Sequence, residues 1–200
     1  MQLPDDENLE KAAAEGDAES QFTLAAACHL GANKDIEEAL KWYTRAAEQG
    51  HSQAQFNLAM MYFVGEDVPK DFDITAKWLK LGAEQGEAAS QNALAVLYYN
   101  GQGVEKSLDE AITWWKRSAY NGNPSAQISL GAMHYDGNGV EKSMVEALMW
   151  HDISIIIGSD DGKKNRETLE KEATPEQIAL AKKQAHEWID FWQMREQDNH

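Results

Sequence analysis

The side chains of this sequence best suited to metal binding or nucleophilic catalysis are six histidines and a single cysteine. They are His29, His51, His134, His151, His186, His200 and Cys28. The histidines form no His-Glu-x-x-His motif, and one cysteine supplies neither a Cys-x-x-Cys pair nor an internal disulfide. We therefore expect no metal site and no cofactor in this chain.

Three short segments resemble parts of nucleotide-binding loops. Gly101-Gln102-Gly103 and Gly137-Asn138-Gly139 follow no predicted strand and lack the third glycine of the dinucleotide fingerprint, so we interpret them as turns between helices. Gly162-Lys163-Lys164 lacks the upstream glycine and the Ser/Thr of a phosphate loop. The sequence also has no Ser-x-x-Lys motif and no set of nucleophile, base and oxyanion donors. It therefore predicts a protein that is not an enzyme.

The elements that position these side chains follow an internal repeat. Two residue types recur on one register, and they are Trp42, Trp78, Trp114 and Trp150, together with Gly50, Gly86, Gly122 and Gly158. A shared register of two independent residue types, with a period in this range, is typical of a stacked array of structural repeats. Such arrays usually bind other molecules on an extended surface.

Each repeat is predicted to form two helices, a first helix and a second helix. The first helices end at Gly31, Gly65, Gly101 and Gly137. The second helices start at the N-cap residues Asp35, Asp71, Ser107 and Ser143. In three repeats a glutamate three residues later predicts a capping box, and these are Glu38, Glu110 and Glu146. The tryptophan is then a buried anchor of the second helix, and the repeated glycine is its C-cap.

The pattern Ala-Gln-x-x-Leu-Gly-x-x-Tyr-x-x-Gly-x-Gly-Val, followed by Ala-x-x-Trp-x-x-x-Ala-Ala-x-x-Gly, resembles the Sel1-like repeat family. The resemblance covers residues 9 to 158. It implies an all-α fold, a right-handed α–α superhelix (solenoid) of helix-turn-helix repeats related to tetratricopeptide repeats. Members of this family are best known as adaptors for protein–protein contacts, often in bacteria.

This sequence departs from the family pattern at a few positions. Cys28 and His134 replace the tyrosine of the first helix, and we interpret both as core residues. A cysteine-rich branch of the family, linked to β-lactam binding, has paired cysteines within each repeat. This chain has no such pairs.

The register divides the chain into six segments. They are residues 1–17 (acidic segment and partial repeat helix), 18–51, 52–87, 88–123 and 124–159 (repeats 1 to 4), and 160–200 (linker and C-terminal capping helices). Residues 160–166 are predicted to be a flexible link, and residues 163–172 suit a short polar helix. Thr174 and Pro175 predict the start of a closing helix. This helix caps the fourth repeat or, alternatively, binds a partner.

The charge of the chain limits its partners. Its 18 Lys+Arg and 34 Asp+Glu residues give a formal charge of −16, which disfavours nucleic acids and anionic membranes and favours a partner with a basic amphipathic segment. The charge can also serve solubility alone. No apolar run is long enough to span a membrane. We expect a soluble protein, cytoplasmic as given, or periplasmic or secreted if a signal peptide has been removed.

A second apolar stripe on the first helices predicts the partner-binding surface. In the second repeat it comprises Phe56, Met60 and Phe63, about 120° around the helix from the core stripe. The residues expected to line the concave face are Phe22, Phe56, Met60, Phe63, Asn92, Val96, Tyr99, Ile128 and Tyr135. Alternatively, neighbouring helices cover much of this stripe.

The function predicted from these features is a non-catalytic adaptor or scaffold that binds another protein or peptide on its concave face. Two alternatives have the same fold. One is a toxin-neutralising immunity or inhibitor protein, whose acidic surface would cover a basic active site. The other is a β-lactam-binding hydrolase, by analogy with the cysteine-rich branch.

Overall fold

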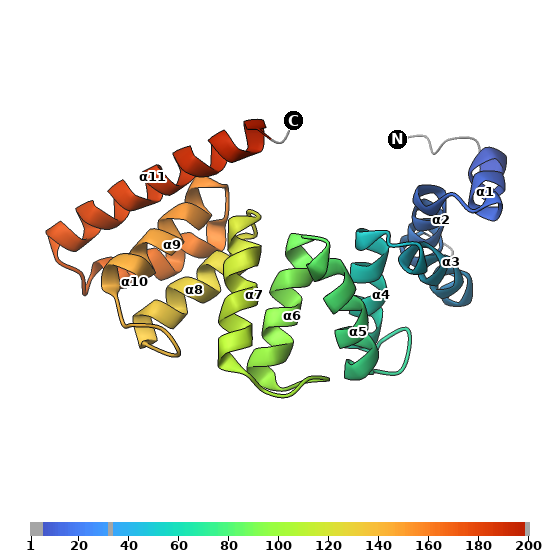
Figure 1. Ribbon diagram of the computed structural model, residues 1–200, viewed down its shortest axis with the longest axis horizontal. Coiled ribbons are helices and arrows are strands. Elements are labelled where there is room, and N and C mark those ends of the chain that lie inside the picture. The colour runs from blue at the N-terminus through green and yellow to red at the C-terminus, as the bar shows by residue number, and fades with distance from the viewer. Residues whose placement is uncertain (1–5, 32–33, 199–200) are drawn as a thin grey trace. The chain divides into compact units, whose positions relative to one another are not determined.

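The computed structural model describes residues 6–31 and 34–198, and all regular structure within these two ranges is α-helical (Figure 1). This result confirms the all-α prediction. The chain divides into two compact units, residues 1–106 and 107–200. Residues 1–5 of the predicted acidic segment and His200 lie outside the described residues.

The first unit contains six of the described helices. They are α1 (Asp6–Glu15), α2 (Ala18–Leu30), α3 (Ile36–Glu48), α4 (Ser52–Val64), α5 (Phe72–Glu84) and α6 (Ala88–Asn100). Each helix packs against the next one along the chain. Leu9 and Ala13 of α1 are buried, and α1 packs against α2. Helix α1 thus takes the place that the second helix of a preceding repeat would take.

The second unit contains the remaining helices. They are α7 (Leu108–Tyr120), α8 (Pro124–Asp136), α9 (Met144–Ile156), α10 (Asp160–Glu170) and α11 (Pro175–Asp198). Helix α9 packs against α8, α10 and α11. Helix α11 buries Ala181, Ala185 and Ile189, and the ring of its Trp188 lies 6.0 Å from that of Trp150. The predicted C-terminal capping helix is therefore confirmed.

The predicted flexible link over residues 160–166 is wrong, because these residues form the first two turns of α10. Asp160 and Asp161 lie in its first turn, where acidic side chains favour a helix N-terminus. Gly162 lets α10 approach α9 closely, since a Cβ at this position would collide with Ser154 Oγ. Arg166 is buried and pairs with Asp152 of α9, which fixes the helix in place.

The second helices start as predicted, but two of the three predicted capping boxes are incomplete, those at Asp35 and Ser143. Each N-cap side chain accepts a hydrogen bond from the backbone N–H three residues later. In a complete capping box the backbone N–H of the N-cap residue donates to the glutamate side chain three residues later. At Asp35 and Ser143 this N–H donates to a backbone carbonyl instead. The backbone N–H of Asp35 donates to the Cys28 carbonyl at 2.9 Å, and that of Ser143 donates to the His134 carbonyl at 2.9 Å. The loop thus ties the second helix directly to the first.

The repeated glycines end the second helices as part of a backbone motif. At the first of them, Gly50 N–H donates to the Ala47 carbonyl and His51 N–H to the Ala46 carbonyl, which is the Schellman pattern. Gly50 has a φ of 90°, which disfavours any residue with a Cβ. Gly31 ends α2 differently, since its φ of −69° and ψ of 167° are extended rather than left-handed.

A buried glutamine connects each first helix to the helix before it. The glutamines are Gln21, Gln55, Gln91 and Gln127, and each Nε2 donates to the backbone carbonyl eight residues earlier at 2.9–3.2 Å. In the second repeat Gln85 Nε2 also donates to Gln55 Oε1 at 2.7 Å. In the fourth repeat Ile157 stands at the position of Gln85, and Gln127 Oε1 has no partner.

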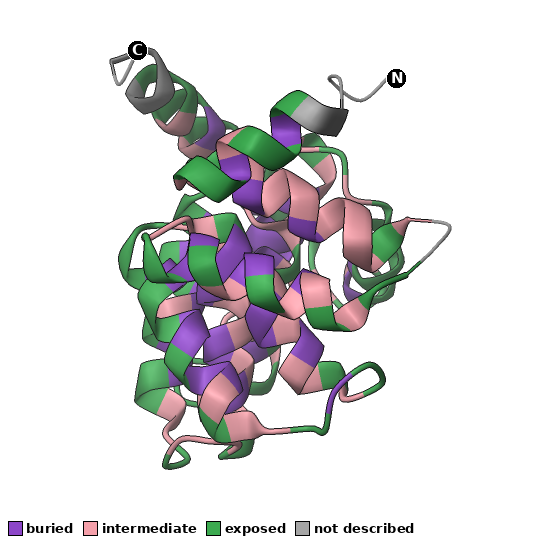
Figure 2. Ribbon diagram, turned by 90° about the vertical axis from the view of Figure 1, so that its right-hand side faces the viewer, coloured by how far each residue is buried: buried purple, intermediate pink, exposed green. Residues whose placement is uncertain are grey.

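The repeated tryptophans belong to the second helices α3, α5, α7 and α9. Figure 2 colours the buried and exposed residues of the helices. Trp42, Trp78 and Trp150 are buried, whereas Trp114 is half-buried. Basic side chains lie over three of the four rings, as with Arg45 over Trp42 at 4.8 Å. Trp150 instead contacts the aromatic rings of Tyr120 and Trp188.

Candidate functional site

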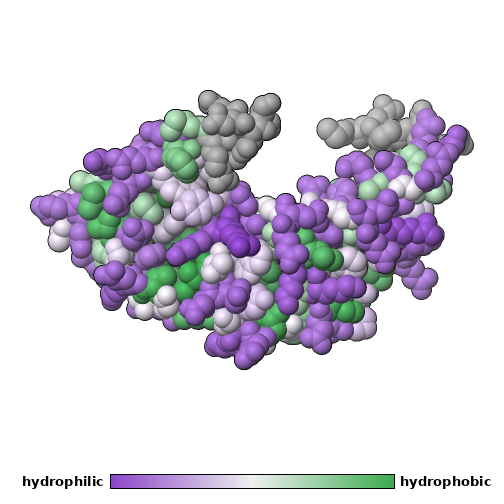
Figure 3. Space-filling model, viewed as in Figure 1, coloured by the Kyte–Doolittle hydropathy of each residue, from purple (hydrophilic) through white to green (hydrophobic). Residues whose placement is uncertain are grey.

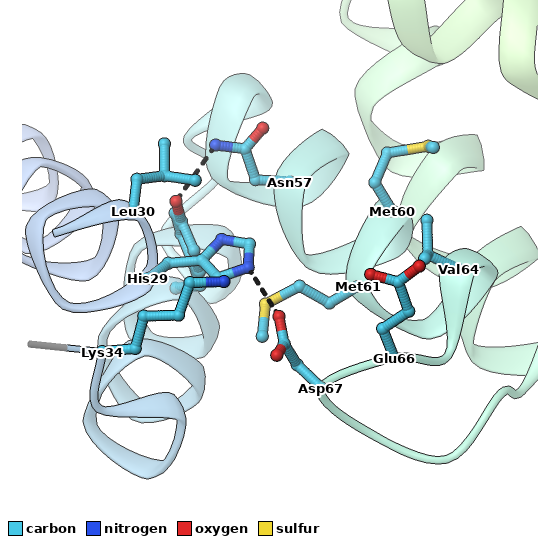
Figure 4. A pocket seen from close by; sticks show the side chains of 10 residues that line it. His29, Leu30, Lys34, Asn57, Met60, Met61, Val64, Glu66 and Asp67 are labelled. Carbon is cyan, nitrogen blue, oxygen red and sulfur yellow. Dashed lines mark hydrogen bonds and ion pairs between the residues drawn. The ribbon is translucent and has the colours of Figure 1, made fainter. Parts of the chain in front are cut away.

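A pocket of about 320 Å³ opens between the first and second repeats, within the first unit (Figure 4). The end of α2 contributes His29 and Leu30, and α4 contributes the side chains at 57, 60, 61 and 64. Tyr43 of α3 is fully buried at its base. Lys34 and the acidic pair Glu66 and Asp67 come from the loops that follow α2 and α4.

Two hydrogen bonds fix the polar side chains of this pocket. His29 Nε2 donates to Asp67 Oδ2 at 3.1 Å, which links α2 to the loop after α4. Asn57 Nδ2 donates to the Tyr43 hydroxyl at 3.3 Å. The His29 ring meets the Tyr43 ring edge-on, with 6.0 Å between centroids. Burial raises the pKa of Tyr43, so its hydroxyl stays protonated at neutral pH.

Apolar side chains beside this polar base are open to solvent. Leu30 is 73% exposed and Val64 is 46% exposed. Met60, which lines the same pocket, is half-buried. The charged side chains of Lys34, Glu66 and Asp67 are exposed at the same pocket. An apolar surface rimmed by charged groups is typical of an interaction site.

The His29–Asp67 pair lacks the other parts of a catalytic site. A carboxylate that orients an imidazole needs a nucleophile within reach of the ring. The neighbouring residue Cys28 is a poor one, because burial and the charges of Asp35 and Glu38 raise the pKa of its thiol. Among residues 6–31 and 34–198, no cluster of three or more His, Cys, Asp or Glu side chains can hold a metal ion.

The nine residues predicted to line the concave face are all half-buried. Met60 lies in the pocket of Figure 4, and Tyr135 lies in a second pocket, within the second unit. Phe22 stacks on His51 with 4.6 Å between ring centroids, and Phe63 meets Phe72 at 5.9 Å. Neighbouring side chains therefore cover part of the predicted stripe, as the alternative interpretation proposed.

The five remaining predicted residues, like Phe22 and Phe63, line neither pocket. They are Phe56, Asn92, Val96, Tyr99 and Ile128. Asn92 has a buried Oδ1 atom without a hydrogen-bond partner, and Lys106 lies over the Tyr99 ring at 5.9 Å. A single binding surface formed by all nine residues stays a prediction.

Sequence reasoning missed several residues that shape the pocket, namely Tyr43, Asn57 and Asp67. A signal for Tyr43 was present, because the residue that follows each repeated tryptophan changes in chemical type from repeat to repeat. These residues are Tyr43, Leu79, Trp115 and His151, and all four are buried. The repeats therefore differ in chemical type at one buried position next to the constant tryptophan.

Within the part of the chain that the structure describes, no helix is both long and apolar enough to cross a membrane. This finding agrees with the absence of a long apolar run in the sequence.

Comparison with known proteins identifies the repeat. A family model described as the Sel1 repeat matches residues 18–51, 52–87, 88–123 and 124–154. A Sel1 repeat protein from Oxalobacter formigenes is 26% identical, with a TM-score of 0.76 over 94% of this chain and 77% of that chain. A protective antigen present in uropathogenic Escherichia coli strains, which displays an SLR fold, is 28% identical. Its TM-score is 0.61, and the match covers 91% of this chain and 47% of that chain.

These two structures confirm the predicted solenoid of helix-turn-helix repeats. An uncharacterized protein from Neisseria meningitidis serogroup B is 47% identical over 51 residues. That match covers 24% of this chain and only 11% of the Neisseria protein. The chain thus spans a small part of this relative and about half of the E. coli antigen.

Proposed function

The chain belongs to the Sel1 repeat family, and from this premise we propose that it is a non-catalytic scaffold that binds a partner protein or peptide on the face formed by its first helices. Sel1 repeat proteins are generally scaffolds for protein–protein interactions and are typically non-catalytic.

The observation that carries the proposal is the pocket between α2 and α4. Leu30 and Val64 expose apolar side chains on either helix, next to a base of buried Tyr43 and hydrogen-bonded Asn57. Exposed apolar groups beside a fixed polar base suit a side chain that inserts from a bound segment. Figure 3 shows that hydrophilic residues surround separate apolar patches on the face in view.

Charge supports a basic partner. The chain has a formal charge of −16, and Glu66 and Asp67 stand at this pocket with one base, Lys34. Complementary charge speeds encounter and selects between partners more than it adds affinity. An amphipathic segment with apolar anchors and flanking Lys or Arg residues therefore fits the pocket and its rim.

The experiment is selection of peptides from a random display library on the full chain. We expect enriched peptides to combine apolar anchors with basic residues, and the paired substitutions Leu30→Asp and Val64→Asp to abolish their binding. Leu81→Asp is the matched control, because Leu81 is an exposed apolar residue of the same unit that lies outside the pocket. Circular dichroism checks that each variant stays helical. Failure to enrich any peptide, or equal binding by the pocket variant and the control, would contradict the proposal.

A further inference from the structure

Helix α11 buries one side in the second unit and exposes apolar residues on another side. It packs on α9 (Figure 1), and Ala185 and Ile189 are buried. Leu180 is 45% exposed, and Phe191 and Met194 are each 58% exposed. The helix that closes the fourth repeat therefore also presents large apolar side chains to solvent, and such side chains mark an interaction surface when they share one side of a helix.

The exposed apolar residues of α11 belong to a heptad pattern. The pattern consists of Leu180, Gln184, Glu187, Phe191 and Met194, which are separated alternately by four and three residues. At 3.6 residues per turn this spacing keeps them in one stripe, about 130° around the helix from the buried side. We call it the outer stripe. Alternating steps of three and four residues are the pattern by which two helices pack along a shared seam.

The outer stripe is complementary to a second copy of itself in the antiparallel direction. When Leu180 of one helix lies opposite Phe191 of the other, a twofold axis repeats the same apolar contact at the other end. The same register places Gln184 of each helix opposite Glu187 of the other, where the carboxamide can donate a hydrogen bond to the carboxylate. A contact of this kind uses the same patch on both subunits and closes as a dimer.

The charges beside the outer stripe match in this register as well. Lys183 and Asp190 lie along one edge of the stripe, and both are exposed. The antiparallel register brings Lys183 of each helix next to Asp190 of the other, which makes two identical pairs of opposite charge. A parallel pair of helices would instead bring Lys183 next to Trp188 on the other edge. Charge complementarity therefore favours a second copy of α11 in the antiparallel direction.

The length of the outer stripe limits the strength of the contact. From Leu180 to Met194 the helix rises about 21 Å, at about 1.5 Å per residue. Stable protein interfaces usually bury about 1,200–2,000 Å² in total, and a contact between one pair of short helices lies at or below the lower end of this range. We therefore expect a reversible dimer.

We propose that α11 docks antiparallel on α11 of a second copy of this chain, through the outer stripe. The inference is independent of the proposed function, because the pocket between α2 and α4 belongs to the first unit.

The test is sedimentation velocity of the full chain from about 1 µM to about 100 µM, the range in which a weak contact dissociates. We expect an equilibrium between monomer and dimer that shifts toward the dimer as concentration rises. Phe191→Asp should remove the dimer over the whole range. Lys183→Asp and Asp190→Lys each place like charges at both pairs, so each should raise the dissociation constant about tenfold.

Restoring the opposite charges should restore the dimer. An equimolar mixture of the Lys183→Asp and Asp190→Lys chains regains both pairs in a heterodimer, and a chain with both substitutions regains them in a homodimer. Lys182→Asp is the matched control, because Lys182 is exposed, undergoes the same charge change and lies on the side of α11 away from the outer stripe. Circular dichroism checks that each variant stays helical.

Three results would overturn the inference. The first is a chain that stays monomeric over the whole concentration range. The second is a dimer that Lys182→Asp weakens as much as Lys183→Asp does. The third is a dimer that neither the mixture nor the double variant restores. Peptide binding at the pocket between α2 and α4 is unaffected by any of these results, so the proposed function is tested separately.

Discussion

Acid should destabilise the second unit through His151, and the size of the effect follows from its environment. The pKa of this imidazole falls from its ordinary value of 6.5 to about 4, because the ring is buried and Arg166 lies nearby. In the unfolded chain the ring is protonated as the pH falls through 6.5, whereas in the folded chain it stays neutral until the pH falls to about 4. The contribution of neutral His151 is therefore complete above pH 6.5 and is lost as the pH falls from 6.5 to about 4.

The magnitude comes from the gap between the two pKa values. Each unit of difference between the two pKa values is worth about 1.36 kcal/mol. The free energy of unfolding is therefore lower by about 3 kcal/mol at pH 4 than above pH 6.5. About 2 kcal/mol of that is already lost at pH 5. Carboxylates also begin to titrate in this range, so the wild-type chain alone does not isolate the effect. The variant His151→Leu keeps all of those carboxylates and lacks the imidazole.

The assay is hydrogen exchange of the α9 amides in both proteins at pH 7.5 and pH 5, corrected for the intrinsic exchange rate at each pH. Exchange of α9 reports on the second unit alone, which matters because repeat arrays need not unfold in one step. We expect the wild-type protein to lose about 2 kcal/mol more than His151→Leu between the two pH values. Equal losses in the two proteins, or an imidazole that titrates near pH 6.5 by NMR, would show that buried His151 does not destabilise the unit in acid.

Four further predictions concern the fold and the binding face. Ile157→Gln should supply the partner that Gln127 Oε1 lacks and raise the free energy of unfolding by about 1 kcal/mol, measured by urea titration; an unchanged midpoint would contradict it. Trp42→Ala should lower the free energy of unfolding by ~3–5 kcal/mol, and Trp114→Ala should lower it less, because Trp114 is only half-buried. The same urea titration compares the two variants, and a larger loss for Trp114→Ala would contradict the prediction. Phe56→Asp combined with Tyr99→Asp should abolish peptide capture while the helical circular dichroism signal persists, and unchanged capture would remove these residues from the binding face. The purified protein should not hydrolyse a chromogenic β-lactam, and robust turnover would contradict the proposal of a non-catalytic scaffold.

The fold was predictable from the sequence because its determinants are local and repeated. The register of tryptophans and glycines predicted the helix pairs. The N-cap side chains of Asp35 and Ser143 accept hydrogen bonds from the first turns of their helices, as predicted. The incomplete capping boxes were not predictable. Their backbone N–H groups bond to carbonyls of the first helix, and that choice depends on how the loop folds back in three dimensions.

The link before the closing helix shows a similar limit. Residues 160–166 are polar and contain a glycine, so their composition resembles a loop. Their helical structure depends on contacts from another part of the chain, namely the pair between Arg166 and Asp152 and the close approach of Gly162 to Ser154. Such tertiary contacts override a weak local preference.

The candidate site was only partly predictable for a related reason. Periodicity predicted a binding face on the first helices, and two of its predicted residues, Met60 and Tyr135, lie in the two pockets. It did not identify the bases of the pockets, since Tyr43 and His151 belong to the second helices and reach the pockets across the repeat.

We propose that a partner segment binds on the face formed by the first helices. A peptide selected from the display library and carrying a photo-reactive phenylalanine analogue at its apolar anchor tests this most directly, with the cross-linked residues identified by mass spectrometry. We expect cross-links to the end of α2, to α4 and to the loop at Glu66 and Asp67, all of which line the pocket of Figure 4. Cross-links confined to the tryptophan-bearing second helices, around Trp42 and Trp78, would show that the segment binds elsewhere.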